Sequence, residues 1–431
     1  MDARPKINKS VWRWLRWILL CLGILFVLAV AFFLVFLYPW GDEKLNITIP
    51  AFQDPKCTRT FNPQFNASSY YQGSLFDTHF HIPPDHKNIF IRGFPRLQKD
   101  ITLQEIVCEL EKEQMIGAIG FYAPSAMLMF TSMSEDQIIE QGSDQGKEIK
   151  NGLPDWFHLL YAPTSDFEGE AVKAYDINPN TYEGFGELVF LKNGNPRPGS
   201  KVDDSESLAM EKFAGEHNNI VMVHPEPSDK DQLENALEQN PQTIFLVHGW
   251  NRQDDVLDLM DKYSNFFFTL DAATLFYEAG RYIDNDSDKF IVQAKKDFET
   301  DLQNAVYQWS RTIELHPDRF LWGTDRCLAD HYSEEFGKFY EEEARAFIGR
   351  LNPDYQEMIA YKNAQDIFEK GLQPQMDTNS QNNQGDFDYL SEDIRSCVIS
   401  NIGEDDWNQL KNHQRPLTEQ ERTIIKQCGG Q

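Results

Sequence analysis

Between residues 74 and 326, eight short apolar runs alternate with longer stretches that have the spacing of amphipathic helices. Residues 103–114 and 231–240 are two such stretches, with apolar side chains recurring every three or four positions. Apolar strands separated by helices imply right-handed crossovers and a parallel sheet. The pattern predicts an α/β fold, a closed (β/α)₈ barrel of the TIM type, with an open doubly wound sheet as the alternative. The predicted strands are 74–81, 116–124, 156–163, 182–190, 219–226, 243–250, 266–273 and 319–326.

Several of these runs end in a side chain that can bind a metal ion. In a barrel of this kind, catalytic residues lie at the carboxyl ends of the strands. Side chains that follow different strands in the sequence should therefore meet at one end of the barrel. The residues concerned are His79, His81, Glu187, His224, His248 and Asp325.

The first run, LFDTHFH, places two histidines two residues apart. Side chains alternate across a strand, so His79 and His81 should point the same way and offer two imidazoles to one cation. The same alternation predicts that Phe76 and Phe80 point toward the covering helices. The alternative is a pair of histidines in a buried strand whose ring nitrogens are hydrogen-bonded to other protein groups and bind no metal.

The ordered set of strand ends resembles the amidohydrolase superfamily, whose members are metal-dependent hydrolases on a distorted (β/α)₈ barrel. The resemblance covers roughly residues 74–372. The phrases HPDRFLWGTD and YKNAQDIF are most similar to the amidohydrolase-related branch, also called amidohydrolase 2. That branch includes hydrolases, decarboxylases and hydratases.

The resemblance assigns a role to each strand-end residue. It implies that His79, His81, His224 and Asp325 are metal ligands and that Asp325 also accepts a proton from the attacking water. Glu187 stands where some relatives have a bridging residue, and it either bridges two ions or lies beside one.

His248 either binds a second ion or stays free to polarise the substrate and hold the developing oxyanion. His248 and Asp325 are therefore the candidate catalytic residues. Asp77 is expected to orient the turn after the first strand.

Imidazole and carboxylate ligands suit zinc first, with manganese, iron and nickel as alternatives. The number of ions, one or two, stays open. The predicted function is a hydrolase that uses a metal-activated water on a C–N or ester bond of a small molecule. A non-hydrolytic decarboxylase of the same branch and a non-catalytic, metal-bearing surface binding protein are the alternatives.

The net charge of −28 argues against partners that bind through broad phosphate contacts, so nucleic acid is not an expected partner. A small anionic substrate remains compatible with a local basic pocket. The predicted loop after the first strand carries His86, Lys87, Arg92 and Arg96, which suggests recognition of a carboxylate or phosphate. Arg326 either grips an anion or forms a structural salt bridge. Barrels of this family often pair, so a homodimer stays open.

Residues 17–38 form an uninterrupted apolar run that is long enough to cross a bilayer as a helix. Residues 1–16 carry five basic side chains and one acidic side chain, which predicts a cytoplasmic N-terminus. The chain is then a single-pass signal-anchor protein of the cell membrane, with its body extracellular, periplasmic or lumenal. A cleaved signal peptide and a buried core helix are the alternatives.

The remaining segments divide by composition. Residues 39–73 form a polar connector, 74–372 the barrel, 373–388 a linker rich in Gln and Asn, and 389–431 a small helical module. A disulfide between Cys397 and Cys428 would staple that module, which has little core of its own. A second disulfide, Cys57–Cys108, would tie the connector to the first barrel helix. Cys327 is then left unpaired.

Overall fold

The computed structural model describes most of the predicted barrel and parts of the segments on either side. The predicted membrane segment 17–38 and the linker 373–388 lie outside the described residues, as do the loop residues 83–100 and Cys327. Among the residues that are described, no helix is both long and apolar enough to cross a membrane. The described ranges are 57–65, 69–82, 103–122, 134–163, 167–190, 200–250, 252–271, 287–326, 329–369, 392–411, 424 and 427–428.

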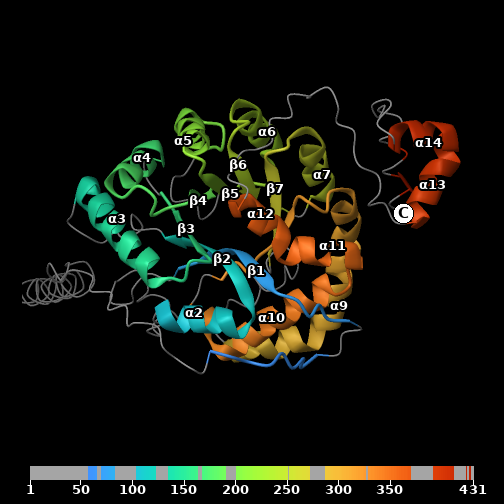
Figure 1. Ribbon diagram of the computed structural model, residues 1–431, viewed down its shortest axis with the longest axis horizontal. Helices are drawn as coiled ribbons and strands as arrows, with labels where there is room; N and C mark the ends of the chain where they lie inside the picture. The colour runs from blue at the N-terminus through green and yellow to red at the C-terminus, as the bar shows by residue number, and fades with distance from the viewer. Residues whose placement is uncertain are drawn as a thin grey trace, which may run out of the picture.

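Eight parallel strands form the centre of the molecule (Figure 1). Each strand pairs with the next one along the chain, in the order β1 to β8, and a bridge between Phe80 and Arg326 joins the first strand to the end of the last. This order confirms the (β/α)₈ barrel and rules out the open doubly wound alternative, in which the strand order reverses. The strands are β1 Leu75–His81, β2 Met115–Tyr122, β3 Phe157–Tyr161, β4 Gly184–Val189, β5 Ile220–His224, β6 Ile244–Val247, β7 Phe266–Leu270 and β8 Phe320–Trp322.

Helices surround the strands, and several begin at the side chains that favour a helix start. Ser134, Asp204 and Ser333 each accept a hydrogen bond from the first turn of the helix that follows. The predicted helices over 103–114 and 231–240 correspond to α2 and α6. The helices around the barrel are α2 Leu103–Lys112, α3 Glu135–Gly152, α4 Phe167–Ile177, α5 Ser205–Glu216, α6 Lys230–Gln239, α7 Gln253–Lys262, α9 Ser287–Leu315 and α10 Glu334–Ile348.

The segment after α10 closes one end of the barrel. It comprises α11 Pro353–Glu357, η6 Met358–Lys362 and α12 Asn363–Glu369, whereas η5 Ala329–Tyr332 precedes α10. The Asn363 amide donates to the carbonyl oxygens of Pro317 and Phe320 at 2.7 and 2.8 Å, so α12 is fixed where β8 begins. Ala364 and Ile367 of α12 then pack against the side chains that fill the barrel.

The apolar core has two layers, one inside the barrel and one between the strands and the helices. Phe80 lies in the outer layer, as predicted, but Phe76 lies in the barrel interior, so that prediction was wrong. The Phe76 ring stacks on the rings of His158 and Phe368. The pairing of β1 with β2 shifts register between Asp77 and Phe80, and this irregularity breaks the two-residue alternation on which the prediction relied.

The segment before β1 is fastened to the outside of the barrel. Cys57 and Cys108 form a disulfide between this segment and α2, as predicted. Next to it, the Arg59 guanidinium contacts Glu109 of α2 at 2.7 Å and Glu341 of α10 at 2.8 Å. In Figure 1 this segment runs alongside α2 and α10.

Two helices near the C-terminus, α13 Glu392–Ile402 and α14 Glu404–Lys411, form the described part of the predicted small module. The structure pairs Cys397 with Cys428, as the sequence predicted. Ile394, Val398 and Trp407 share a small apolar cluster with Leu257 of α7 and Leu315 of α9. The module therefore rests on two barrel helices.

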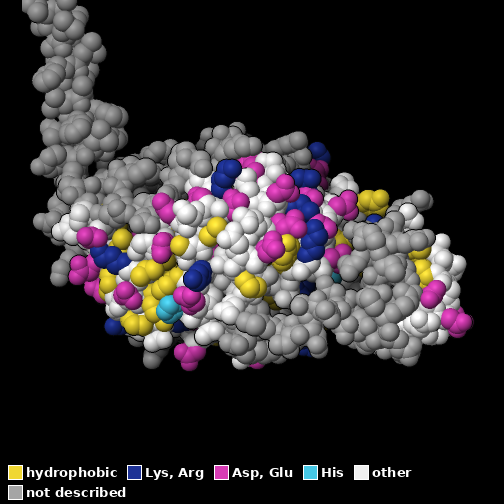
Figure 2. Space-filling model, turned by 90° about the horizontal axis from the view of Figure 1, so that it is seen from above, with side chains coloured by type: hydrophobic (Ala, Val, Ile, Leu, Met, Phe, Trp, Pro, Cys, Tyr) yellow, Lys and Arg dark blue, Asp and Glu magenta, His cyan; other side chains and the backbone are white. Residues whose placement is uncertain are grey.

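Charged side chains of both signs are interspersed on the face that Figure 2 shows. Many of the charged groups form ion pairs; the Lys262 ammonium group of α7, for instance, lies 3.0 Å from carboxylate oxygens of Glu234 on α6 and of Asp258 on α7. Basic groups in such pairs are partly neutralised. That nucleic acid is not a partner stays a prediction.

Candidate metal centre

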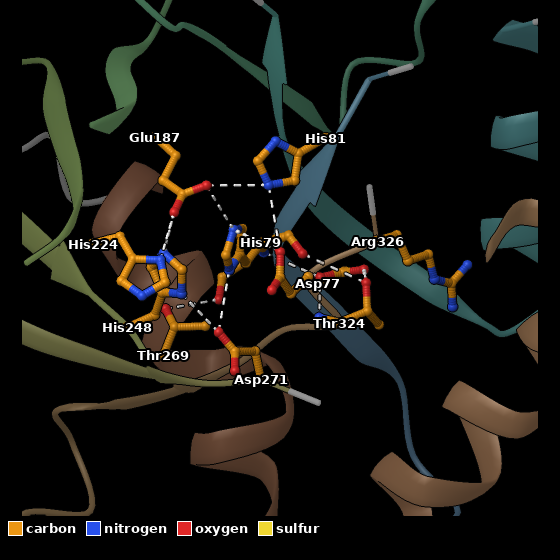
Figure 3. A network of polar contacts seen from close by, with 12 residues as sticks. Asp77, His79, His81, Glu187, His224, His248, Thr269, Asp271, Thr324 and Arg326 are labelled. Carbon is orange, nitrogen blue, oxygen red and sulfur yellow. Dashed lines mark hydrogen bonds and ion pairs between the residues drawn. The ribbon is translucent and has the colours of Figure 1, made fainter. Parts of the chain in front are cut away.

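The carboxyl ends of the strands bring together all six residues that the sequence singled out; Figure 3 labels five of them, and Asp325 contacts His79 and His81. His79 and His81 end β1, Glu187 lies near the end of β4, and His224 ends β5. His248 follows β6 directly, and Asp325 comes three residues after β8. A seventh residue, Asp271, follows β7 and belongs to the same network.

Four donor atoms from β1, β4 and the segment after β8 lie close together; we call them the β1 group. They are Nε2 of His79 and His81, Oε2 of Glu187 and Oδ1 of Asp325. His79 Nε2 lies 3.7 Å from the Glu187 oxygen and 3.4 Å from the Asp325 oxygen. His81 Nε2 lies 3.2 and 3.4 Å from the same two oxygens.

The spacing of the β1 group fits a metal ion. A tetrahedral zinc ion with ligand bonds of about 2.0–2.1 Å holds its ligand atoms about 3.3–3.4 Å apart. The four separations between imidazole nitrogens and carboxylate oxygens, 3.2 to 3.7 Å, scatter around that value. His79 Nε2 is also buried without a hydrogen-bond partner, which is unusual for a polar atom unless something else occupies its lone pair.

The other oxygen of Glu187 faces two further imidazoles; we call these atoms the β5–β6 group. Glu187 Oε1 lies 2.9 Å from Nδ1 of His224 and 2.7 Å from Nε2 of His248. One carboxylate thus directs one oxygen to each group. The separations of 2.7 and 2.9 Å are those of direct hydrogen bonds, shorter than the spacing of ligand atoms around zinc, so the bridging role of Glu187 stays a prediction.

Asp271 lies on the far side of two of these histidines. Its Oδ2 is 2.9 Å from Nδ1 of His248 and 3.3 Å from Nδ1 of His79. The sequence analysis missed this residue, although it follows an apolar run as Asp325 does. Its position directly after Leu270 of β7 was the available signal.

Asp77 fastens the end of β1 to the segment after β8. Its Oδ1 accepts hydrogen bonds from the backbone N–H of His79 and Thr324, and its Oδ2 accepts one from the Thr324 hydroxyl at 2.6 Å. The backbone N–H of Asp325 donates to the carbonyl oxygen of His79 at 2.7 Å. The expected orienting role of Asp77 is therefore confirmed, and it positions ligands on both strands.

Two glycines allow the ligands to approach one another. Gly249 has φ of +80°, and a Cβ atom there would lie 2.2 Å from Nε2 of His224. Gly186 has φ of +135°, and its Cβ would lie 2.5 Å from the carbonyl oxygen of Met222. Any side chain at either position would be strained and would displace β5 or its histidine.

Arg326 is a structural residue. It is fully buried, and its two terminal nitrogens contact the two carboxylate oxygens of Glu113 at 2.9 and 2.5 Å. Its guanidinium carbon also lies 4.8 Å from the centre of the Tyr340 ring. The salt bridge that the sequence left open is confirmed. The basic loop with His86, Lys87, Arg92 and Arg96 lies outside the described residues.

Opposite charges dominate the electrostatics of the site. Burial alone would lower the pKa of His248, but the charge of Glu187 and hydrogen bonds to Asp271 and Glu187 raise it to about 10. In the same way, burial opposes but the carboxylates of Asp325 and Glu187 raise the pKa of His81 to about 9. Burial would raise the pKa of Asp271, yet its hydrogen bonds with the imidazoles hold it below the usual value. Protons on the imidazoles thus balance the carboxylates where a cation is absent.

The site is closed on one side and open on the other. His79 and Asp271 are fully buried and His248 is 1% exposed, whereas the side chains of His81 and Asp325 are 31% and 27% exposed. A Phe121 ring covers His79 and His81 at centroid distances of 5.2 and 5.4 Å. A substrate would reach the cluster past His81 and Asp325.

Comparison with known proteins finds likeness only among solved structures, since no protein family and no curated protein matches. A probable 2-pyrone-4,6-dicarboxylic acid hydrolase from Acinetobacter baumannii is 16% identical, with 69% of this chain and 99% of that chain covered and a TM-score of 0.43. A 2,6-dihydroxybenzoate decarboxylase from Rhizobium is 12% identical over 69% and 99%, with a TM-score of 0.44. A Burkholderia multivorans amidohydrolase described with bound zinc is 13% identical over 68% and 98%, with a TM-score of 0.42. These sequence identities and TM-scores are too low to assign a function, so the function of this chain has to be argued from the geometry of its site.

Proposed function

We propose that this chain is a metal-dependent enzyme of the amidohydrolase superfamily that hydrolyses a C–N or ester bond in a small molecule. The observation that carries the proposal is the β1 group, in which the Nε2 atoms of two histidines each lie 3.2 to 3.7 Å from an oxygen of Glu187 and one of Asp325. Simple hydrogen bonding would not leave the buried Nε2 of His79 without a partner. A divalent cation in the β1 group would bind this atom and balance the nearby carboxylates.

The ligand assignment follows from the two donor groups. His79, His81 and Asp325 would hold one ion together with one oxygen of Glu187. His224 and His248 would hold a second ion with the other oxygen of Glu187, so we propose two ions. Zinc is proposed first because the ligands are imidazoles and carboxylates, and manganese, iron and nickel are the alternatives. A divalent cation, when bound, lowers the pKa of a water molecule and polarises a substrate oxygen.

Asp325 is the proposed proton acceptor. Its carboxylate touches the β1 group, yet its side chain is partly open to solvent, unlike those of Asp271 and Glu187. A proton taken by Asp325 can therefore pass to a leaving group at the open side of the site.

His248 is better suited to metal binding than to holding an oxyanion. Both of its ring nitrogens are engaged by carboxylates, Nδ1 by Asp271 and Nε2 by Glu187. It is also almost completely buried, so a substrate oxygen could reach Nε2 only after that contact is broken. We therefore assign the catalytic function of His248 to its role as a ligand.

We also propose that residues 17–38 anchor the chain in a membrane with the barrel outside the cytoplasm. The long apolar run and its basic flank support this placement. The two disulfides add support, because disulfides persist mainly in oxidising compartments. Protease protection in sealed vesicles tests the orientation. A barrel that is digested only from the cytoplasmic side would refute it.

Metal analysis of the detergent-solubilised full chain tests the enzyme proposal. The expected result is about two equivalents of a transition metal, lost in a His79→Ala/His81→Ala variant and retained in a His316→Ala control. His316 pairs with Asp261 far from the site. A folded wild type that stays metal-free after reconstitution would refute the enzyme and favour the binding protein. Assays in ¹⁸O-labelled water then separate the two chemistries, since a hydrolase incorporates the label and a decarboxylase releases carbon dioxide.

A further inference from the structure

One oxygen of Asp271 contacts a histidine from each of the two donor groups. Oδ2 lies 3.3 Å from Nδ1 of His79, which belongs to the β1 group, and 2.9 Å from Nδ1 of His248, which belongs to the β5–β6 group. The two imidazole rings are neighbours, with centroids 4.0 Å apart. Asp271 is completely buried.

These contacts fix which nitrogen of each ring carries a proton. An ionised carboxylate only accepts hydrogen bonds, so both Nδ1 atoms must be N–H donors toward Asp271. In a neutral imidazole the other nitrogen, Nε2, then has a free lone pair, the form that binds a metal ion. Both Nε2 atoms face Glu187, that of His79 toward Oε2 and that of His248 toward Oε1.

We propose that Asp271 is a positioning residue that prepares one ligand of each metal position at once and thereby couples the affinities of the two positions. The inference rests on the proposed function, since it requires two ions at this site. Carboxylates that orient a ligating histidine typically change metal affinity by about 10–100-fold. Here a single carboxylate would have that effect at two positions.

The other two histidines of the site do not share this arrangement. The side chains of His81 and His224 are 31% and 22% exposed. His224 turns Nδ1 toward Glu187, whereas His248 turns Nε2 toward it. Removing His224 should therefore affect the β5–β6 group alone, and it provides the matched control.

The test is zinc titration of the detergent-solubilised full chain against a chelator, with wild type, Asp271→Asn and His224→Ala compared. Asp271→Asn keeps the size of the side chain but removes its negative charge, and because both imidazoles contact the same position, a neutral amide group then faces both of them. We expect both zinc affinities to fall, each by about 10–100-fold, while His224→Ala weakens only one. Loss of one affinity in Asp271→Asn, or of neither, would overturn the coupling.

A measurement on the wild type covers the case in which Asp271→Asn does not fold. Cobalt(II) in place of zinc shifts the proton resonances of ligating imidazoles far from the rest of the spectrum. Two shifted N–H resonances that exchange slowly with water are expected, because the Nδ1–H groups of His79 and His248 point at a buried carboxylate. Their absence would overturn the inference. A third cobalt equivalent would also do so, because it would place an ion among His79, His248 and Asp271 themselves.

The outcomes separate this inference from the proposed function. A wild type that binds no metal refutes the proposed function and the inference with it. A wild type that binds two ions with unequal dependence on Asp271 leaves the function standing and refutes only the coupling.

Discussion

Zinc binding at pH 6 should release at least about two protons from the folded protein. In the metal-free site, the carboxylates raise the pKa of His81 to about 9 and that of His248 to about 10. Both imidazoles are therefore positively charged at pH 6, with a proton on each ring nitrogen. A histidine that binds a metal through Nε2 must give up the proton on that nitrogen. Each of the two ligands contributes one released proton.

The affinity for zinc should increase with pH. Burial lowers the pKa of His79, but Asp325, Asp271 and Glu187 raise it above the usual value, so this ligand adds to the protons that compete with the ions. Because at least two protons compete, the overall affinity for zinc should rise at least about 100-fold per pH unit near pH 7 and level off above pH 10. The folding stability of the metal-free protein changes with pH in the opposite direction. The pKa values of about 9 and about 10 lie above the unfolded value of about 6.5, so the stability that these two histidines contribute is present below pH 6.5 and lost through pH 9 to 10.

Calorimetric titration in several buffers measures the released protons. The observed enthalpy changes with the ionisation enthalpy of the buffer, and the slope is the number of protons transferred. A His81→Ala variant should release about one proton fewer than wild type. Full zinc loading with no proton release would refute the reasoning, because it would show that the carboxylates do not hold protons on these imidazoles.

Three further predictions concern stability. Arg326→Met leaves Glu113 buried without its partner. Burial raises the pKa of Glu113 to about 8 even beside Arg326, so in the variant its carboxyl group takes up a proton and stays unpaired. The free energy of unfolding at pH 7 should fall by about 1–3 kcal/mol, and Arg326→Met/Glu113→Leu should recover most of the loss in denaturant titrations; a double variant as unstable as the single one would contradict this. Glu343 is buried with neither carboxylate oxygen hydrogen-bonded to the part of the chain that the structure describes, and burial raises its pKa well above the usual value. The folded state therefore loses stability as pH rises above the ordinary pKa of a glutamate, so Glu343→Gln should be more stable than wild type at pH 8 in denaturant titrations, an advantage that should vanish near pH 4. Removing the disulfide with Cys57→Ser/Cys108→Ser opens a loop with a sequence separation of 51, which should cost about 4 kcal/mol in thermal unfolding while leaving zinc binding intact.

The sequence predicts the barrel and most of its site because both depend on local patterns. Apolar runs mark the strands, and the residue that ends each run is carried to the same end of the barrel as the others. His224 and His248 could therefore be placed in one cluster although β5 and β6 were known only as apolar runs.

The missed features depend on contacts between distant strands. Nothing near Asp271 in the sequence indicates that β1 and β6 would bring two imidazoles to one of its oxygens. The direction of Phe76 depends on a register shift against β2, which the residues of β1 do not encode by themselves. Whether Arg326 faces an anion or Glu113 was likewise decided only by where α2 ends beside β8.

The fastening of the segment before β1 also has a mechanical consequence. β1 supplies two of the candidate ligands, and the chain enters it only 18 residues after Cys57. A pull on the chain from the N-terminal side reaches the covalent link to α2 before it reaches β1. The load then passes through the disulfide and through the ion pairs of Arg59 into α2 and α10. Tension on the N-terminal end is thus diverted to the outer helices, and His79 and His81 keep their spacing.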